Sequence, residues 1–247
     1  MDAPRGIALA LSAGMKQQQS LVRTAAKIAA GGAAIAAAGY AALAGAAWLR
    51  FGHPQRTGTP DEHDHLLDGF VPEYDVVERH HILVNAPAVV TLECARGLDM
   101  GEAWLPRMLF KTRELVLHGQ IVPPPAGGLV LSMLQIGWGI LAEKPGHEIV
   151  LGAVTRPWEP NPVFRSVGAR EFGAFSEPGY VKIAFTLRAD PAGPDRSIFR
   201  TETRAVATDA EARLRFRRYW SMVSPGVALI RMSMLDPIRA AAERAAA

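Results

Sequence analysis

The chain has 247 residues, of which 49% are hydrophobic and 21% are charged, an ordinary globular composition that suffices for one domain and an appendage. Its formal net charge of +3 arises before residue 28, because basic and acidic residues balance at 23 each in the remainder. A neutral globular part argues against nucleic-acid binding, which needs a basic face, and the single cysteine, Cys94, excludes an intramolecular disulfide.

The amino-terminal part combines a basic tail, residues 1–27, with a segment, Ile28–Leu49, that carries no charge. As a helix this segment would be about 33 Å long, enough to cross a hydrocarbon core of ~30 Å. Trp48 and Arg50 stand where an interfacial anchor belongs. The sequence therefore predicts a single membrane span. A cleaved signal peptide that uses the small residues near Ala44–Ala46, or a soluble Ala-rich helix, are the alternatives.

Charge around this segment predicts its orientation. Four basic residues precede it and an acidic stretch follows it, which favours an amino terminus inside the cytoplasm and a folded domain outside. Residues 50–65 are rich in Pro, Gly and charge and are predicted to be a linker, so the domain is expected to span residues 66–247. Two histidines and three carboxylates lie in Asp61–His65, but a linker lacks the rigid scaffold of a metal site, and no metal is predicted.

The middle of the chain changes from helical to strand patterns. Alternation over Tyr74–Val84 predicts a first strand. A hairpin is expected where Pro145 and Gly146 separate Gly137–Glu143 from Glu148–Thr155. Helices are predicted over Ala88–Arg96, Trp104–Leu117, Leu129–Gln135 and, as a short piece, Ala169–Phe175.

The last third predicts a hairpin followed by a long helix. The strands Gly179–Asp190 and Ser197–Ala207 each have one uncharged face and one charged face, and the charged faces are expected to be solvated because unpaired buried charge is costly. Thr208–Glu211 resembles a capping box with Thr208 as the cap, and the apolar positions after it recur at steps of three and four. The helical spacing continues past Pro225 and Gly226, which predicts a kink there rather than a change of direction, and Pro225 and Pro237 together predict a helix in about three pieces. These elements predict an α+β fold in which an antiparallel sheet wraps around a long carboxy-terminal helix.

The order of these elements resembles that of the SRPBCC superfamily, START-related proteins with the helix-grip fold, and is similar in particular to bacterial members described as polyketide cyclase/dehydrase-like. The resemblance covers residues 66–247. It implies a cavity between the sheet and the terminal helix that receives a lipid, polyketide, sterol or other apolar ligand. The residues that carry it are Asn85-Ala-Pro87, Gly137-Trp-Gly139, Gly152–Glu159, Gly179–Phe185 and Phe199–Arg204.

The uncharged strand faces must meet the helix, which makes their residues the candidate cavity lining. Arg156 and Trp158 are candidates for the cavity mouth, where Trp could cover an apolar ligand and Arg could meet its carboxylate or phosphate; anchoring of their own loop is the alternative. The predicted ligand-binding residues are Trp138, Val181, Ile183, Phe185, Phe199, Thr201, Phe216 and Trp220.

One pair of residues is a candidate for catalysis. Glu78 and His80 share a strand face and could supply acid–base catalysis of the cyclase type; ordinary surface, or a salt bridge to Arg200 or Arg204, is the alternative. The chain lacks a Walker loop, a dinucleotide fingerprint, a Cys-x-x-Cys pair and a nucleophile elbow, so no cofactor is predicted.

These observations favour a membrane-anchored binding or carrier domain for a hydrophobic small molecule, without turnover. A cyclase- or aromatase-like enzyme that acts on a bound apolar substrate is one alternative. An envelope domain that docks a protein partner and has only a vestigial cavity is the other. A cavity with several convergent polar groups would favour the enzyme, and an interior filled by side chains would favour the docking domain.

Overall fold

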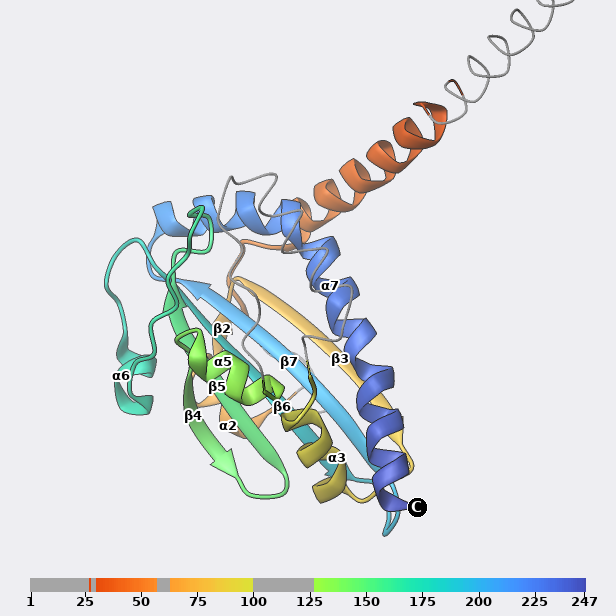
Figure 1. The fold of residues 1–247 in the computed structure, drawn as a ribbon. Coiled ribbons are helices and arrows are strands. Elements are labelled where there is room, and N and C mark those ends of the chain that lie inside the picture. Colours follow the sequence, from red (N-terminus) through yellow and green to blue (C-terminus); the bar gives the residue numbers. More distant parts are fainter. Residues whose placement is uncertain (1–26, 28–29, 57–62, 100–126) are drawn as a thin grey trace, which may run out of the picture. The chain divides into compact units, whose positions relative to one another are not determined.

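The computed structural model describes residues 27, 30–56, 63–99 and 127–247, so the predicted helix over Trp104–Leu117 lies outside it (Figure 1). The chain divides into two compact units, Met1–Gly45 and Ala46–Ala247. One described helix, Ala30–Arg50, is long and apolar enough to cross a membrane, and little of it is buried. It overlaps the predicted apolar segment, although a signal sequence near the amino terminus would meet the same criteria of length and composition.

The second unit is built on a five-stranded antiparallel sheet with the strand order β3-β7-β6-β5-β4. Two short strands, β1 and β2, pair separately. The predicted hairpins are β4–β5 and β6–β7, and Gly146 has the positive φ of 70° that the third position of a Pro-Gly turn requires. The strands are β1 (Gln55–Arg56), β2 (Glu73–Tyr74), β3 (Val76–Val84), β4 (Gly139–Lys144), β5 (Glu148–Thr155), β6 (Val181–Pro191) and β7 (Ser197–Ala207).

Helices cover both faces of this sheet. On one face, α3 (Ala88–Arg96), α5 (Leu129–Gln135) and α7 (Ala210–Ala246) pack against the uncharged positions of β5, β6 and β7. On the other face, α2 (His65–Asp68) and α6 (Ala169–Ala174) form a smaller core with β3, β5 and β6. A long carboxy-terminal helix across an antiparallel sheet is the helix-grip arrangement, as predicted.

The terminal helix α7 differs from its prediction in two ways. It continues for 37 residues through Pro225 and Pro237, so the expected division into three pieces is wrong. Figure 1 shows two stretches that run in different directions, a first one that begins at Ala210 and a second one that ends at Ala246, so the expectation of a kink without a change of direction is wrong as well. A proline removes one backbone hydrogen bond and bends a helix, and packing on the sheet keeps the remainder helical. The cap is Asp209 rather than Thr208: the Asp209 carboxylate accepts from the Ala212 amide at 2.8 Å, whereas the Thr208 hydroxyl donates to the Tyr180 carbonyl.

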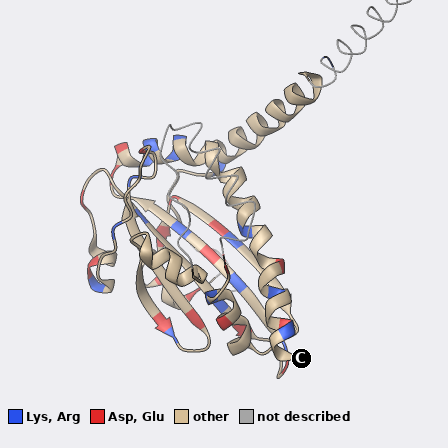
Figure 2. Cartoon of the chain, viewed as in Figure 1, with Lys and Arg blue, Asp and Glu red and all other residues tan. Residues whose placement is uncertain are grey.

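The charged sheet face is largely covered, with Glu202 and Arg204 buried and Lys182, Arg188 and Arg200 partly exposed, which corrects the expectation that it is solvated. Arg204 has a fully buried side chain that donates to Glu202 Oε1 at 2.6 Å and to Asp68 Oδ1 at 2.5 Å. Arg188 likewise contacts Asp64 and Asp190, at 3.4 Å and 2.9 Å. Figure 2 shows the basic and acidic positions interleaved along the central strands. Each buried arginine of this network lies beside a carboxylate, so the burial of charge is compensated.

For one carboxylate of this face, Glu148, the favourable effect of Arg188 is outweighed by burial and by a neighbouring carboxylate. Only 4% of the residue is exposed, and the equally buried Asp64 lies next to it. Burial, reinforced by the Asp64 carboxylate, raises the pKa of Glu148 from 4.5 to about 8. The folded domain therefore holds a proton at neutral pH that the unfolded chain releases.

The expected consequence is that the free energy of unfolding falls as the pH rises from about 4.5 to about 8, because the unfolded state binds fewer protons in this range. Glu148→Gln removes the titration. The variant should match the unchanged protein near pH 4.5 and exceed its stability above pH 8 by at least about 1.4 kcal/mol, the equivalent of one pKa unit. Urea unfolding at both pH values measures this, with the exposed Glu171→Gln as control. A stability difference that does not change with pH would contradict it.

The described part of residues 50–65, predicted to be a linker, contacts the rest of the second unit. Phe51 is 3% exposed and packs edge-on against Trp220, with ring centroids 6.2 Å apart. Just before this range, the Trp48 carbonyl accepts from the Arg217 guanidinium at 2.8 Å, and within it the Asp64 side chain caps α2. The limits of the folded domain, predicted as residues 66–247, stay a prediction that these contacts make testable.

Two truncated chains, 46–247 and 66–247, test the amino-terminal limit. Both are expected to fold, but the shorter chain lacks the buried ring of Phe51 and should be less stable by about 3 kcal/mol or more, the usual cost of removing a buried aromatic side chain. Urea unfolding measures both, and Phe51→Ala in the longer chain isolates the ring. Equal stability of the two chains would contradict the importance of these contacts.

Candidate ligand-binding cavity

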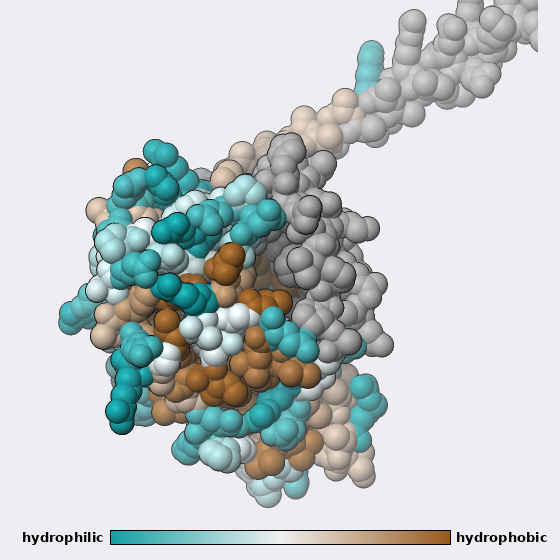
Figure 3. Space-filling view, turned by 60° about the vertical axis from the view of Figure 1, so that its left-hand side comes forward, coloured by the Kyte–Doolittle hydropathy of each residue, from teal (hydrophilic) through white to brown (hydrophobic). Residues whose placement is uncertain are grey.

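A cavity of about 290 Å³ lies between α7 and the sheet, at the lower end of the size range in which small molecules bind. Its walls come from β6, β7, α5 and α7, and from the loops that contain Pro157 and Phe164. Figure 3 shows hydrophobic residues gathered in a hollow on one face of the molecule, with hydrophilic residues around it. The lining is apolar apart from a few side chains, so an apolar molecule is the natural occupant.

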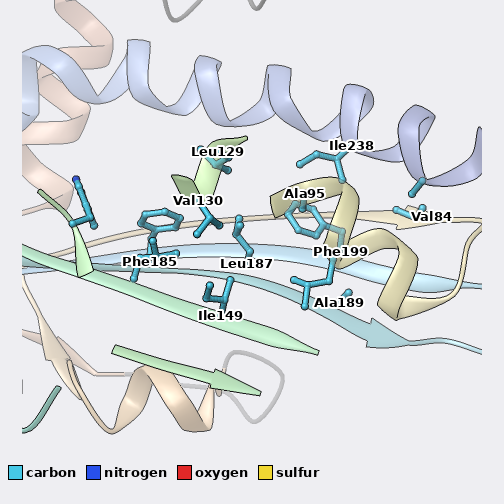
Figure 4. Packing of buried hydrophobic residues seen from close by; sticks show 14 of the residues in the cluster. Val84, Ala95, Leu129, Val130, Ile149, Phe185, Leu187, Ala189, Phe199 and Ile238 are labelled. Carbon is cyan, nitrogen blue, oxygen red and sulfur yellow. The ribbon is translucent and has the colours of Figure 1, made fainter. Parts of the chain in front are cut away.

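The cavity occupies the space between two hydrophobic clusters on the same sheet face. One cluster joins α3, α5 and the second stretch of α7 to β5, β6 and β7; Figure 4 shows Phe185, Leu187 and Phe199 of the sheet pointing toward these helices. The other joins the first stretch of α7 to Phe51 and to the ends of β3, β6 and β7. Both clusters contribute to the cavity wall, which is therefore continuous with the packed core on either side.

Trp138 is held in the wall by the backbone before it and by two aromatic neighbours. Gly137 has a φ of 101°, and a Cβ at this position would lie 2.1 Å from the Phe164 carbonyl oxygen, so only glycine allows this approach. The Trp138 ring stacks on Phe164, with centroids 5.5 Å apart, and meets Phe185 edge-on at 5.2 Å. The indole is therefore fixed in one orientation rather than free to fill the hollow.

The structure brings most of the predicted lining residues together. Val181 is the exception: it is fully buried in the cluster around Phe216 and does not reach the cavity. Whether the others contact a ligand stays a prediction. The seven predicted residues on the wall are Trp138, Ile183, Phe185, Phe199, Thr201, Phe216 and Trp220.

The two predicted mouth residues are engaged elsewhere. Arg156 donates to the Gly179 carbonyl at 3.2 Å and lies over the Tyr180 ring at 4.3 Å, contacts that anchor its own loop. Trp158 packs against the cluster that contains Phe216. Pro157, between them, is the residue of this loop that lines the cavity.

Sequence reasoning missed Arg231, which lies on α7 and lines the cavity. Its guanidinium donates to Thr201 Oγ1 at 3.0 Å and also to Thr203 Oγ1. Burial lowers the pKa of Arg231 to about 10, so the side chain remains cationic at neutral pH. A signal existed: Arg231 stands at helical spacing between the inward apolar residues Val227 and Met234.

The candidate pair Glu78 and His80 lies on the cavity side of the sheet but not on the cavity wall. In the β3–β7 register they stand opposite Thr203 and Thr201, which places all four on one face. His80 Nε2 is 3.8 Å from Glu78 Oε2. Burial raises the pKa of Glu78, against the effect of Arg50 and Arg231, and burial lowers the pKa of His80.

The proposed salt bridges of this pair to Arg200 or Arg204 are wrong, because those arginines contact Asp190 and Glu202 instead. The pair is thus a partly buried acid and base with shifted pKa values, and neither residue lines the cavity. A catalytic role for it stays a prediction.

In residues 27, 30–56, 63–99 and 127–247, no group of three or more His, Cys, Asp or Glu side chains is placed to hold a metal ion. Asp61 and Glu62 of the acidic stretch lie outside the described residues. Within it, His63 contacts Asp68 at 3.0 Å and Asp64 caps α2. These side chains serve the local structure.

No protein-family model matches the chain, and no curated protein sequence matches it. Among solved structures, the chain is similar to a point mutant of norcoclaurine synthase from Thalictrum flavum in complex with a transition-state analogue: the identity is 16%, the match covers 66% of this chain and 91% of that one, and the TM-score is 0.31. It is also similar to the Zhui aromatase/cyclase from Streptomyces sp. R1128, with 12% identity, 68% and 94% coverage, and a TM-score of 0.25. The helix-grip description of the second unit rests on its own strand order and on the position of α7.

Proposed function

We propose that this chain is a membrane-anchored binding or carrier protein for a hydrophobic small molecule, lipid or polyketide-like, and that its domain belongs to the SRPBCC superfamily. The observation that carries the proposal is the apolar cavity of about 290 Å³ between α7 and the sheet. A hollow of this kind costs stability, because its lining side chains lose the contacts that a packed core would give them. A ligand that fills it restores those contacts.

The character of the wall supports binding rather than turnover. Aromatic and aliphatic side chains form nearly all of it, and its described polar side chains include no carboxylate and no histidine. The acid–base pair Glu78 and His80 does not reach the wall. A cyclase- or aromatase-like activity is the second candidate, favoured by the position of this pair on the cavity side of the sheet, and it requires the pair to touch a bound substrate.

The docking alternative has less support. A docking domain is expected to have an interior filled by side chains, whereas the second unit contains a cavity between the two hydrophobic clusters on the α7 side of the sheet. The membrane part of the proposal is carried by the helix Ala30–Arg50, which has the length and the apolar composition of a span.

Binding of N-phenyl-1-naphthylamine, a neutral apolar dye that fluoresces in apolar surroundings, tests the cavity. The protein should bind the dye, and Phe199→Trp should weaken binding several-fold with a change in stability below about 1 kcal/mol, because the larger ring can extend into the hollow. Phe172→Trp is the matched control. Phe172 is fully buried in the core on the other sheet face, so overpacking there should cost about 1 to 3 kcal/mol and leave dye binding intact.

A large loss of stability in Phe199→Trp together with unchanged dye binding would contradict the cavity proposal. Dye binding that survives Phe199→Trp but is lost in Glu78→Gln or His80→Gln would instead show that the pair contacts the ligand and would favour the enzyme.

The proposed topology places the carboxy-terminal domain outside the cytoplasm, because basic residues precede the apolar segment and acidic residues follow it. In spheroplasts of a bacterial expression host, added protease should therefore digest the domain while a cytoplasmic marker survives. A domain that resists the protease until the membrane is lysed reverses the orientation. Release of the domain as a soluble, shortened chain identifies the apolar segment as a cleaved signal.

A further inference from the structure

The cavity wall carries a single charged side chain among the described residues that form it. That side chain belongs to Arg231, which projects from the second stretch of α7 toward β7. Its guanidinium carbon lies 5.9 Å from the centroid of the Phe185 ring, another wall residue. A full positive charge therefore borders a hollow whose described wall is otherwise apolar apart from the hydroxyls of Thr201, Thr203 and Tyr219 and two indole N–H groups.

This charge lacks the compensation that Arg204 and Arg188 have on the other sheet face. Arg204 and Arg188 each lie within 4 Å of a carboxylate, whereas no described Asp or Glu lies that close to Arg231. Glu78 interacts electrostatically with Arg231 from a greater distance, and burial raises the pKa of Glu78. A buried cation without a partner is costly, and an anion placed beside it removes much of the cost.

The hydrogen-bonding groups around Arg231 are predominantly donors. A guanidinium has five N–H donors and no acceptor, and the described contacts use two of its nitrogens on Thr201 and Thr203. Each threonine hydroxyl that accepts from Arg231 still has its own proton to donate. The indole N–H groups of Trp138 and Trp220, two further wall residues, also find no acceptor within the described part of the chain.

We propose that Arg231, with Thr201 and Thr203, forms an anion-binding subsite in the cavity wall, and that the ligand is a hydrophobic molecule with an acidic oxygen group, such as a carboxylate or a sulfonate. The ligand's apolar body lies against the aromatic wall and its oxygens accept from the guanidinium and the two hydroxyls. This subsite rests on the proposed binding function and narrows it from apolar molecules in general to amphipathic acids. A planar guanidinium suits this task because two of its N–H groups can face two oxygens of one acid group.

A matched pair of dyes tests the subsite. 8-Anilinonaphthalene-1-sulfonate and N-phenyl-1-naphthylamine share one ring system and differ by the sulfonate, so the ratio of their affinities reports the anion contact alone. Arg231→Met should lower the affinity for the sulfonate dye about 10-fold or more and leave that for the neutral dye within about 3-fold. Arg231→Lys should retain part of the preference because it keeps the charge and loses the planar fork.

Arg215→Met is the matched control, since Arg215 also lies on α7 but is exposed and pairs with Glu211. It should leave both affinities unchanged, which excludes adsorption of the sulfonate dye on the basic surface of α7. Thr201→Val removes one hydroxyl without changing the charge and should lower the affinity for the sulfonate dye about 3-fold. This variant and Arg231→Lys decide the test if Arg231→Met does not unfold cooperatively.

The outcomes separate the two proposals. If Arg231→Met folds and the ratio of the two affinities stays the same, the subsite is overturned and Arg231 only balances the charge of Glu78, while the cavity function stands. If the unchanged protein binds neither dye, the cavity function itself fails. Displacement of the neutral dye by decanoate, and weaker displacement of it by decanoate in Arg231→Met than in Arg215→Met, extends the subsite to carboxylates.

Discussion

The attachment of α7 to the sheet at two separate places is the constraint on which the rest of this domain depends. Near its start, the Asp209 carboxylate accepts from the amides of Ala212 and Gly179, and the buried Asp75 accepts from Arg213 and from the Ala207 amide. Further along, Ile238 is buried against the cluster of α3, α5 and the sheet. The helix bridges the space between these attachments, and the bridged space is the cavity.

The far sheet face shows why an antiparallel sheet with a charged face can still be covered on both sides. Arg204 brings a full charge into the interior, and the chain segment that covers it supplies Asp68, the Val71 carbonyl and the ring of Tyr74. The alternation of β7 identifies this face as charged, but it does not indicate which segment of the chain covers the face. The covering groups lie more than 125 residues away in the chain, and pairings over such distances leave no periodic trace in a single sequence.

Local patterns therefore predicted what local forces determine. β7, α3 and α5 have the predicted bounds, because alternation, turn residues and helical spacing act within each element. Four of the seven predicted residues on the wall, Ile183, Phe185, Phe199 and Thr201, lie on the strand faces that were expected to meet the helix, and their contact with a ligand stays a prediction. The unbroken course of α7 through both prolines and the inward position of Arg231 were not predicted. Tertiary packing overrides the cost of a proline, and a single sequence does not show which arginine, a residue that is usually exposed, faces a cavity.

The two sheet faces handle buried charge differently, and the difference bears on function. On the far face, the buried arginines meet carboxylates from the same domain, as expected where burial serves only the fold. On the cavity face, the neighbours of Arg231 along the inward side of α7 are aliphatic, and a methionine or leucine in its place would complete the apolar wall and remove the cost of a desolvated cation. Natural proteins depart from locally favourable choices mainly at functional sites. Stability alone thus accounts for the paired arginines of one face but not for Arg231, the cation among the described residues of the cavity wall.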